Sequence, residues 1–470
     1  MSAADVPDCA PAPVDPVHRM GLLVDDRSLR LMPGPVDASA VSATGRIDGR
    51  PVGLFACDPR RGGGALGEAS SQVIVGTIEA AVRRHVPVVG IWHSGGARLQ
   101  DGTASLHGIG RVFRTIVEAS GRIPQVSVVL GPAAGGAAYG PALTDFVISG
   151  PASRIFVTGP EIVRRVTGEA VDAAVLGGPE QHATTSGLTH VAEPSDAAAL
   201  GVARALVGLL SVRQVAAPSP VCSDLRFRAV LPTSPRRAYD VHRIVDLLLD
   251  EESPRVELQR RWGRNVVTVV GRIGGRTVGV LANNPLHLAG CLDSTGSEKA
   301  ARFVRTCDAL GLPLAVLADV PGYLPGRRQE AEGIVRRGAK LLHAFAESVV
   351  PRVTVIVRKA YGGAFVAMNS RALGATAVFA WPAAEVGVMH PRSAVAILHR
   401  RLLGALPTER HAAALEELAA AYERGAGGLS GAVARKHVDQ VIDPADTKRF
   451  VTEALASAVG LRGVHSNIPL

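Results

Sequence analysis

The sequence is poor in the residues that mark several protein classes. Only 4% of its 470 residues are aromatic, and lysine occurs five times. The five cysteines are scattered, without a Cys-x-x-Cys pair or the spacing of a zinc site, which favours reduced thiols. No apolar run is long enough to span a bilayer, and residues 1–16 lack the features of a secretory signal. These absences predict a cytoplasmic protein with no metal site and no membrane contact.

Arginine dominates the charge. Lysine and arginine number 51 against 42 acidic residues, which gives a formal net charge of +9. An arginine-rich surface suits the phosphates of a nucleotide-bearing cofactor, although an arginine-biased genome explains the same composition. No basic run is interleaved with aromatic residues, so nucleic acid is not predicted as a partner. The 47% of hydrophobic residues and the 52 glycines favour closely packed α/β structure.

The chain repeats itself once, with an offset of 226 residues. Residues 45–53 read GRIDGRPVG and residues 271–279 read GRIGGRTVG, and seven of the nine positions agree. Such a repeat predicts two copies of one fold. We expect an N-terminal domain over residues 1–225 and a C-terminal domain over residues 226–470, joined by a proline-rich linker.

Two further pairs of motifs keep nearly the same spacing. HSGGARL begins at His93 and DVPGYLP at Asp319. GGAAY begins at Gly135 and GGAFV at Gly362. The two halves therefore share their glycine turns as well as their opening strands.

Each half alternates segments typical of strands and of helices. Buried strands are expected at VPVVGIW and LPLAVLA, and amphipathic helices before them over residues 71–84 and 298–310. Further buried strands, residues 126–130 and 353–357, run directly into the Gly-Gly-Ala steps. This alternation predicts parallel pairing with right-handed crossovers. The fold class is α/β, with two tandem crotonase-like domains of stacked ββα units.

Each Gly-Gly-Ala step lies where a strand ends and a helix begins. A helix start offers unpaired N–H groups and a positive dipole end, and glycine lets another molecule approach the backbone. The candidate donors are the amides of Gly136 and Ala137 in the first half, and of Gly363 and Ala364 in the second. Close packing would explain one such step. Two at equivalent places favour a pair of oxyanion holes that stabilise an enolate.

No side chain stands out as a nucleophile or a general base. The GxSxG, HExxH and Walker A motifs are absent. His93, His107 and His390 lie near glycine turns, where a lone histidine is more often structural, and Glu68 suits the start of a helix. The chemistry is therefore expected to bring its own base.

Many ordered motifs resemble those of the β subunits of acetyl-CoA and propionyl-CoA carboxylases of actinobacterial type. They include GGGALGEASSQ, SGGARLQDG, PAAGGAAYGPALTDFVI, AGCLDSTGSEKAARFVRTCDALGLP, DVPGYLPG and RKAYGGAF, and the resemblance runs from about Gly45 to Leu470. It implies a homohexamer that moves CO2 from carboxybiotin to the α-carbon of an acyl-CoA. It also implies that each active site joins the first domain of one subunit to the second domain of its partner.

The resemblance divides the site residues between the two ligands. The thioester carbonyl is expected at Gly136 and Ala137, and the ureido oxygen of carboxybiotin at Gly363 and Ala364. The other residues expected to bind acyl-CoA are Gly95, Gly96, Ala97, Arg98, Gly135, Tyr139 and Val366. The other residues expected to bind biotin are Gly322, Tyr323, Leu324, Gly362 and Phe365. Once CO2 has left, the biotin enolate is expected to remove the α-proton, which explains the missing side-chain base.

The chain lacks two parts that a complete biotin-dependent carboxylase needs. It has no Met-Lys-Met site for attaching biotin, and nothing resembles an ATP-binding fold. The resemblance therefore implies a partner α subunit with biotin carboxylase and biotin carboxyl carrier domains.

Three places depart from the family's pattern. His93 stands where aspartate usually precedes SGGAR, and residues 390–393 (HPRS) replace a glycine-rich stretch. Val366 stands where propionyl-CoA members carry aspartate, and an apolar residue there predicts other acyl chains, longer or branched. Two alternatives stay open: a decarboxylase that runs the same step in reverse, and a structural β subunit with impaired catalysis in a mixed hexamer.

Overall fold

The computed structural model describes residues 14–211, 221–234 and 237–468. Contacts between Cα atoms divide the chain into two compact units, Met1–Ser211 and Val212–Leu470.

The division lies upstream of residue 225 because the segment that follows the first unit packs on the second. Phe227 is fully buried in the core of the second unit, and the N–H of Asp224 donates to the carbonyl of Ala445 at 2.8 Å. Of the prolines in the expected linker, Pro218, Pro220 and Pro235 lie outside the described residues.

The first unit is built on a twisted sheet with the strand order β1-β2-β3-β4-β5-β6-β8, and β7 pairs with β5. The strands are β1 (Arg30–Leu31), β2 (Ala40–Ile47), β3 (Arg50–Cys57), β4 (Val88–Ser94), β5 (Gln125–Ala134), β6 (Phe146–Ser149), β7 (Arg154–Phe156) and β8 (Val191–Ala192). β2 and β3 form an antiparallel hairpin, and the pairs from β3 onward are parallel.

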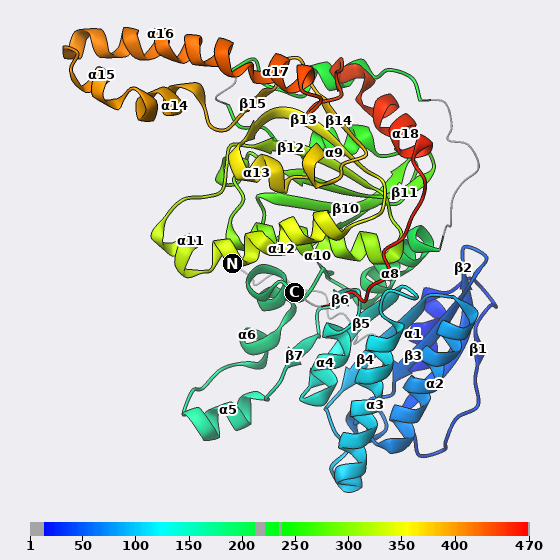
Figure 1. The fold of residues 1–470 in the computed structure, drawn as a ribbon. Helices are drawn as coiled ribbons and strands as arrows, with labels where there is room; N and C mark the ends of the chain where they lie inside the picture. The colour runs from blue at the N-terminus through cyan, green and yellow to red at the C-terminus, as the bar shows by residue number, and fades with distance from the viewer. Residues whose placement is uncertain (1–13, 212–220, 235–236, 469–470) are drawn as a thin grey trace, which may run out of the picture. The chain divides into compact units, whose positions relative to one another are not determined.

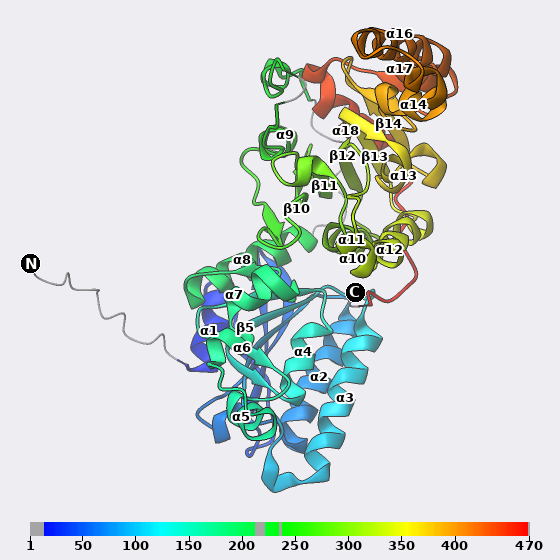
Figure 2. The same cartoon turned by 90° about the vertical axis from the view of Figure 1, so that its left-hand side faces the viewer.

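Helices cover both faces of this sheet. Figure 2 shows α2 (Glu68–Arg84) and α3 (Thr103–Ala119) on one side, and α1 (Pro16–Leu23) and α8 (Asp196–Leu210) on the other. The remaining helices of the unit are α4 (Gly136–Ala142), α5 (Pro160–Thr167), α6 (Ala173–Gly177) and α7 (Pro179–Gln181). The parallel pairing of strands joined by helices confirms the predicted α/β class.

The second unit repeats this plan with the strand order β16-β14-β13-β12-β11-β10-β9, and β15 pairs with β13. The strands are β9 (Val256–Leu258), β10 (Val266–Ile273), β11 (Arg276–Asn283), β12 (Leu314–Val320), β13 (Arg352–Tyr361), β14 (Ala377–Ala380), β15 (Glu385–Gly387) and β16 (Gln440–Val441). Figure 1 shows α10 (Ser294–Leu310) beside α12 (Ile334–Glu347) against this sheet. The other helices are α9 (His242–Leu248), α11 (Arg327–Ala331), α13 (Gly362–Ala367), α14 (Pro391–Leu398), α15 (Arg400–Gly404), α16 (Thr408–Ala426), α17 (Gly428–Ala434) and α18 (Thr447–Ser457).

The two units keep the predicted offset in their strand register. Ile47 pairs with Arg50 at the end of the first hairpin, and Ile273 pairs with Arg276 at the end of the second. Helix α10 begins before the expected residue 298 because the side chain of Asp293 caps it, accepting the N–H of Gly296 at 2.7 Å. The sequence repeat is therefore a structural repeat.

One difference between the units bears on the site. The second unit carries a helical arm, α14 to α16, which returns to the sheet through α17 (Figure 1). Helices α14 and α16 pack on each other, and α17 packs on β15. No helix in the described ranges is long and apolar enough to cross a membrane.

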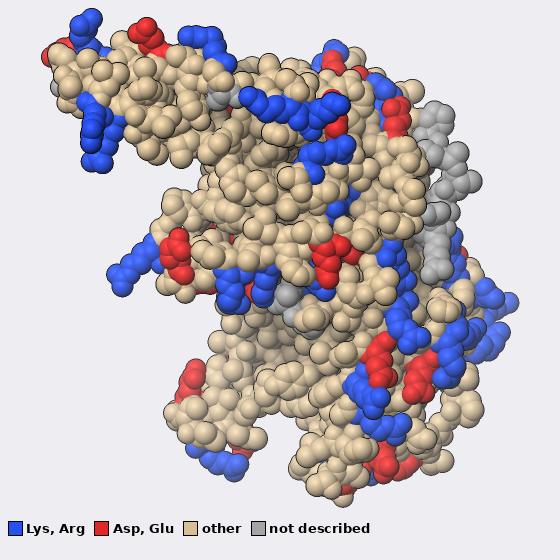
Figure 3. Space-filling view, in the orientation of Figure 1, with Lys and Arg blue, Asp and Glu red and all other residues tan. Residues whose placement is uncertain are grey.

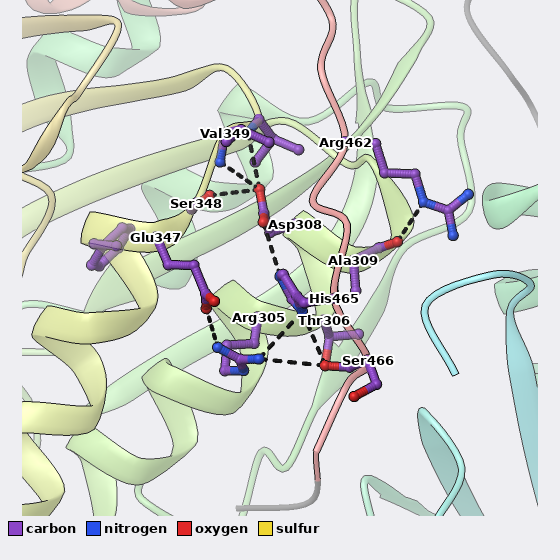
Figure 4. Close-up of polar contacts among 12 residues, drawn as sticks. Arg305, Thr306, Asp308, Ala309, Glu347, Ser348, Val349, Arg462, His465 and Ser466 are labelled. Atoms are coloured by element: carbon purple, nitrogen blue, oxygen red, sulfur yellow. Dashed lines mark hydrogen bonds and ion pairs between the residues drawn. The ribbon is translucent and has the colours of Figure 1, made fainter. Parts of the chain in front are cut away.

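The tail after α18 is fastened to α10 (Figure 4). Nε2 of His465 lies 3.0 Å from a carboxylate oxygen of Asp308, whose other oxygen accepts the Ser348 hydroxyl at 2.9 Å. Arg302 donates to the backbone and side-chain oxygens of Asn467, both at 2.9 Å. These bonds hold the tail along α10.

Candidate active site

The first Gly-Gly-Ala turn joins β5 to α4. Gly135 has a φ of 57°, a left-handed conformation that favours glycine, and its N–H donates to the carbonyl of Phe156 at 3.0 Å. Gly136 and Ala137 are the first two residues of α4. Within residues 14–211, no acceptor is found for their two N–H groups. The turn thus offers a pair of adjacent donors at a helix start.

The loop of residues 95–98 passes directly beside this turn. A Cβ on Gly96, whose φ is 109°, would lie 2.9 Å from the carbonyl oxygen of Ala134, the last residue of β5. The loop is held by backbone bonds: the Gly95 N–H donates to Gly63 at 3.0 Å and the Arg98 N–H to Leu66 at 3.1 Å. The structure therefore brings the predicted loop and the predicted donors together.

Tyr139 lies one turn into α4. Its ring makes an edge contact with Phe113, with 6.0 Å between centroids, and the side chain is about half exposed. It is placed beside the first turn, on the same short helix as Gly136 and Ala137.

The second turn joins β13 to α13 and copies the first. Gly362 has a φ of 60°, and a Cβ there would lie 3.0 Å from the carbonyl oxygen of Val388. Gly363 and Ala364 follow in α13, and in the part of the chain that the structure describes their N–H groups have no acceptor. Gly135 and Gly362 occupy equivalent places, so each unit presents the same pair of donors.

The loop of residues 322–324 lies against the second turn. The N–H of Leu292 donates to Gly322 at 3.1 Å, and the N–H of Leu324 donates to Leu292 at 2.8 Å. Tyr323 lies in the middle of this loop. Its ring would be 3.2 Å from a Cβ added to Gly338 and 4.0 Å from a Cβ added to Gly363. Tyr323 is therefore a neighbour of the second donor pair.

The Tyr323 hydroxyl is a buried polar group that needs a partner. Its oxygen is inaccessible to solvent, and among the described residues it has no hydrogen-bond partner. Burial raises the pKa of Tyr323 to about 12, so the hydroxyl stays protonated at neutral pH. The hydroxyl end of the ring lies over Gly338 of α12, and the opposite ring edge faces Gly363.

A cavity of about 1280 Å³ opens beside α13 in the second unit. Figure 3 shows the surface hollowed beneath the helical arm. The expected site residues in its wall are Gly362, Gly363, Phe365 and Val366. Val366 is 38% exposed, so its side chain faces this space rather than the core. The cavity is wider than most small-molecule pockets and has room for more than one ligand group.

Sequence reasoning missed the far wall of this cavity. It is formed by β15, the loop that follows it and the junction of α16 and α17, with Glu385, Met389, Tyr422, Glu423 and Leu429 among the lining residues. These residues come together only through the packing of the arm and of α17 on β15. No motif in the sequence marks them.

The structure explains how the first unit accommodates His93. The ring lies against Gly131, where a Cβ would approach it to 2.4 Å, and its Nδ1 lies 3.3 Å from the guanidinium of Arg19. Arg19 is paired with Asp196 at 2.9 Å. Burial and the charge of Arg19 lower the pKa of His93, so the neutral ring accepts the Arg19 hydrogen bond.

The equivalent residue of the second unit, Asp319, has a different set of partners. Its carboxylate accepts the Tyr239 hydroxyl at 2.9 Å, the Arg358 Nε at 3.1 Å and the Lys359 N–H at 3.1 Å. The first unit has Gly131 and Pro132 at the places of Arg358 and Lys359, so both of those donors are missing. A neutral ring at residue 93 therefore leaves no such donor unpaired.

The unusual residues 390–393 lie next to the second turn. His390 is the residue before α14, and its ring lies 6.1 Å from the ring of Tyr361, which precedes Gly362. Met389 and Pro391 line the cavity. Arg392, in the first turn of α14, pairs with Glu416 of α16 at 2.6 Å.

Charge and metal-binding groups are dispersed. On the face drawn in Figure 3, basic and acidic side chains are interspersed rather than gathered in one patch. The described residues contain no cluster of three His, Cys, Asp or Glu side chains that could hold a metal ion.

Known proteins resemble this chain in sequence and in structure. The chain is 52% identical over 459 residues to the biotin-dependent acetyl-/propionyl-coenzyme A carboxylase beta6 subunit of Mycobacterium tuberculosis, covering 97% of both chains. It is 50% identical to the propionyl-CoA carboxylase beta chain of Rhodococcus erythropolis, again covering 97% of both.

A solved structure of transcarboxylase 12S, described as a hexamer assembly with methylmalonyl-coenzyme A bound, matches with a TM-score of 0.90 and 38% identity. The match covers 96% of this chain and 92% of that one. The carboxyl transferase domain family matches residues 26–461. The chain therefore belongs to the carboxyl transferase family, among the β subunits of biotin-dependent acyl-CoA carboxylases.

Proposed function

We propose that this chain transfers CO2 from carboxybiotin to the α-carbon of an acyl-CoA, with the thioester held by the first unit and carboxybiotin by the second. One observation carries the proposal: both units present a pair of N–H groups without acceptors, at equivalent glycine turns. An enolate oxygen is the ligand that such paired donors stabilise.

The second turn fits the ureido group of biotin. Gly363 and Ala364 offer two donors to its oxygen, and the ring edge of Tyr323 lies beside Gly363. The adjoining cavity of about 1280 Å³ has room for the bicyclic ring. Carboxybiotin, when bound there, supplies CO2 and the base that takes the α-proton.

The residues of this chain act by binding and positioning. The amides of Gly136 and Ala137 stabilise the negative charge that forms on the thioester oxygen when the α-proton leaves. The amides of Gly363 and Ala364 stabilise the matching charge on the ureido oxygen. Gly95 to Arg98 and Tyr139 border the first ligand, and Gly322 to Leu324 with Phe365 border the second.

The assembly follows from the same proposal. A biotin-carrying α subunit would deliver carboxybiotin. Six copies of this chain would form a homohexamer, which agrees with the description of the similar 12S structure as a hexamer assembly. Both turns keep their donors, which a purely structural β subunit would not need.

Fixation of radiolabelled bicarbonate tests the proposal. The purified chain is mixed with ATP and a biotinylated α subunit that works with a known β subunit, across a panel of acyl-CoA chain lengths. We expect acid-stable label in one or more acyl-CoAs. Gly363→Val should lower the rate about a hundredfold, because its side chain fills the space in front of the donors.

Gly363 was chosen because there is room for a side chain at this position, so a loss of rate in Gly363→Val can be attributed to the blocked donors. A Cβ on Gly363 meets only the Tyr323 ring, at 4.0 Å, so the fold should tolerate the change. Gly201→Ala on α8 is the control, since a Cβ there meets nothing within 4 Å and the rate should not change. No label with any acyl-CoA, while the known β subunit is active, would refute the proposal and favour the decarboxylase or structural alternative.

A further inference from the structure

A tyrosine and a glutamate form a pair beneath the second glycine turn. Tyr361 is the last residue of β13 and directly precedes Gly362. Its hydroxyl donates to a carboxylate oxygen of Glu385 at 2.9 Å. Tyr361 is 6% exposed, and both side chains line the cavity of about 1280 Å³. The bond therefore lies within the proposed carboxybiotin site.

The strand register explains how the two side chains meet. Lys359 pairs with Glu385 and Tyr361 pairs with Gly387 between the parallel strands β13 and β15. Residues two apart on a strand share a face, so the Tyr361 ring must cross residue 387 to reach Glu385. The ring lies directly over residue 387, where a Cβ would be in ordinary van der Waals contact with it at 3.5 Å.

The Tyr361 hydroxyl keeps the proton that it donates to Glu385. Burial and the Glu385 carboxylate raise the pKa of Tyr361, so the phenol remains protonated. In the described part of the chain, Tyr361 is the group that hydrogen-bonds Glu385. A phenol donating to a carboxylate is stronger than a hydrogen bond between neutral groups.

The first unit has no such pair. Ala134 stands at the place of Tyr361, opposite Phe156, and Arg154 stands at the place of Glu385. Arg154 bonds backbone carbonyls of its own loop instead. The tyrosine–glutamate pair therefore occurs at the second turn and not at the first.

We propose that Glu385 is a positioning residue for the biotin half of the reaction, which acts through Tyr361 to fix the turn that presents the Gly363 and Ala364 donors. The proposal rests on the proposed function. Its geometric basis is that Tyr361 is bonded to Glu385 through its side chain and to the donor turn through its backbone. Because the first turn lacks the pair, acyl-CoA binding should not depend on it.

Three variants of the full chain separate positioning from folding. Tyr361→Phe removes only the hydroxyl, Glu385→Ala removes the acceptor, and Glu385→Gln keeps an oxygen that can accept the bond. The assay is transfer of CO2 to free biotin from the carboxylated acyl-CoA that the wild-type chain makes. We expect the first two variants to lose about tenfold in kcat/KM for biotin, and Glu385→Gln to stay within about threefold of wild type.

The test is completed by comparing the kinetics for biotin with those for acyl-CoA. A residue with only a structural role would affect both equally. The KM for acyl-CoA should match wild type, and Arg154→Gln, at the equivalent place in the first unit, should change neither KM. Normal biotin kinetics in Tyr361→Phe, or equal losses for biotin and acyl-CoA, would overturn the inference. A wild-type chain that carries no CO2 between acyl-CoA and biotin would instead refute the proposed function.

Discussion

Val366 is an apolar residue in the wall of the cavity beside the second turn. It lies two residues after the donor Ala364 and is 38% exposed to a cavity with further apolar wall residues such as Met389 and Leu429. A carboxylate at this place would have to give up hydration when an alkyl chain lies beside it. Valine carries no such cost, and we therefore expect the cavity to accept larger apolar acyl groups.

Val366→Asp should narrow the acyl range. We expect the rate with longer or branched acyl-CoAs to fall about tenfold relative to the rate with propionyl-CoA, because the buried charge is desolvated by the chain. The measurement is kcat/KM across acyl-CoA chain lengths. Val366→Leu keeps the site apolar and is the control for altered packing. An unchanged chain-length profile in Val366→Asp would contradict the assignment.

His93 shows how one residue is interpreted differently alone and in context. From the sequence, it departs from an expected aspartate and left open a loss of catalysis. In the structure, its neutral ring fills the space over Gly131 and accepts from Arg19, whose charge Asp196 balances. The departure is accommodated structurally, and it does not disturb the donors of the first turn.

At the scale of elements, the strands and helices of the repeat could be predicted because their signals are local. The hairpins at Ile47–Arg50 and Ile273–Arg276 keep the offset of the sequence motifs. The short strand β15 and helix α17 could not be predicted, because their position depends on packing against each other and on β13. Glu385 was missed for the same reason.

The contact between α9 and β9 carries a titratable group. His242, at the start of α9, places Nε2 3.0 Å from Glu257 of β9 and also contacts Asp240. The hydrogen bond to Glu257, aided by Asp240, raises the pKa of His242 to about 9 from its ordinary 6.5. The protonated ring therefore joins the helix to the edge strand.

This pairing predicts a stability that depends on pH. Because the pKa of His242 is higher in the folded chain, its contribution is fully present below pH 6.5 and is lost as the pH rises through about 9. His242→Gln should cost about 1 kcal/mol of unfolding free energy at pH 6, since the side chain is partly exposed. The effect is measured as the difference in urea unfolding midpoint between the wild type and His242→Gln, at pH 6 and at pH 10. A difference that is equal at both values would show that the charge of His242 contributes nothing.

At the scale of the whole molecule, the proposed function divides one reaction between the two units. Each unit presents one donor pair, and under the proposal the transfer needs both pairs. The resemblance to the carboxylase β subunits implies that a site takes its first unit from one subunit and its second from another. A chain damaged in one unit should then be complemented by a chain damaged in the other.

Mixing two inactive variants tests that division. Gly136→Val is damaged in the acyl-CoA half and Gly363→Val in the biotin half. If sites form between subunits of a symmetric oligomer, random mixing in equal amounts should leave about a quarter of the sites with two intact halves. Bicarbonate fixation should therefore recover to about a quarter of the wild-type rate after the variants are unfolded and refolded together, and stay absent when each is refolded alone. Wild-type chain refolded in the same way sets the reference. A Cβ on Gly136 would lie 3.2 Å from Ile109, so both variants must first be shown to refold to the wild-type oligomer. If they do and the mixture stays inactive while the refolded wild type works, each subunit must instead build its site from its own two units.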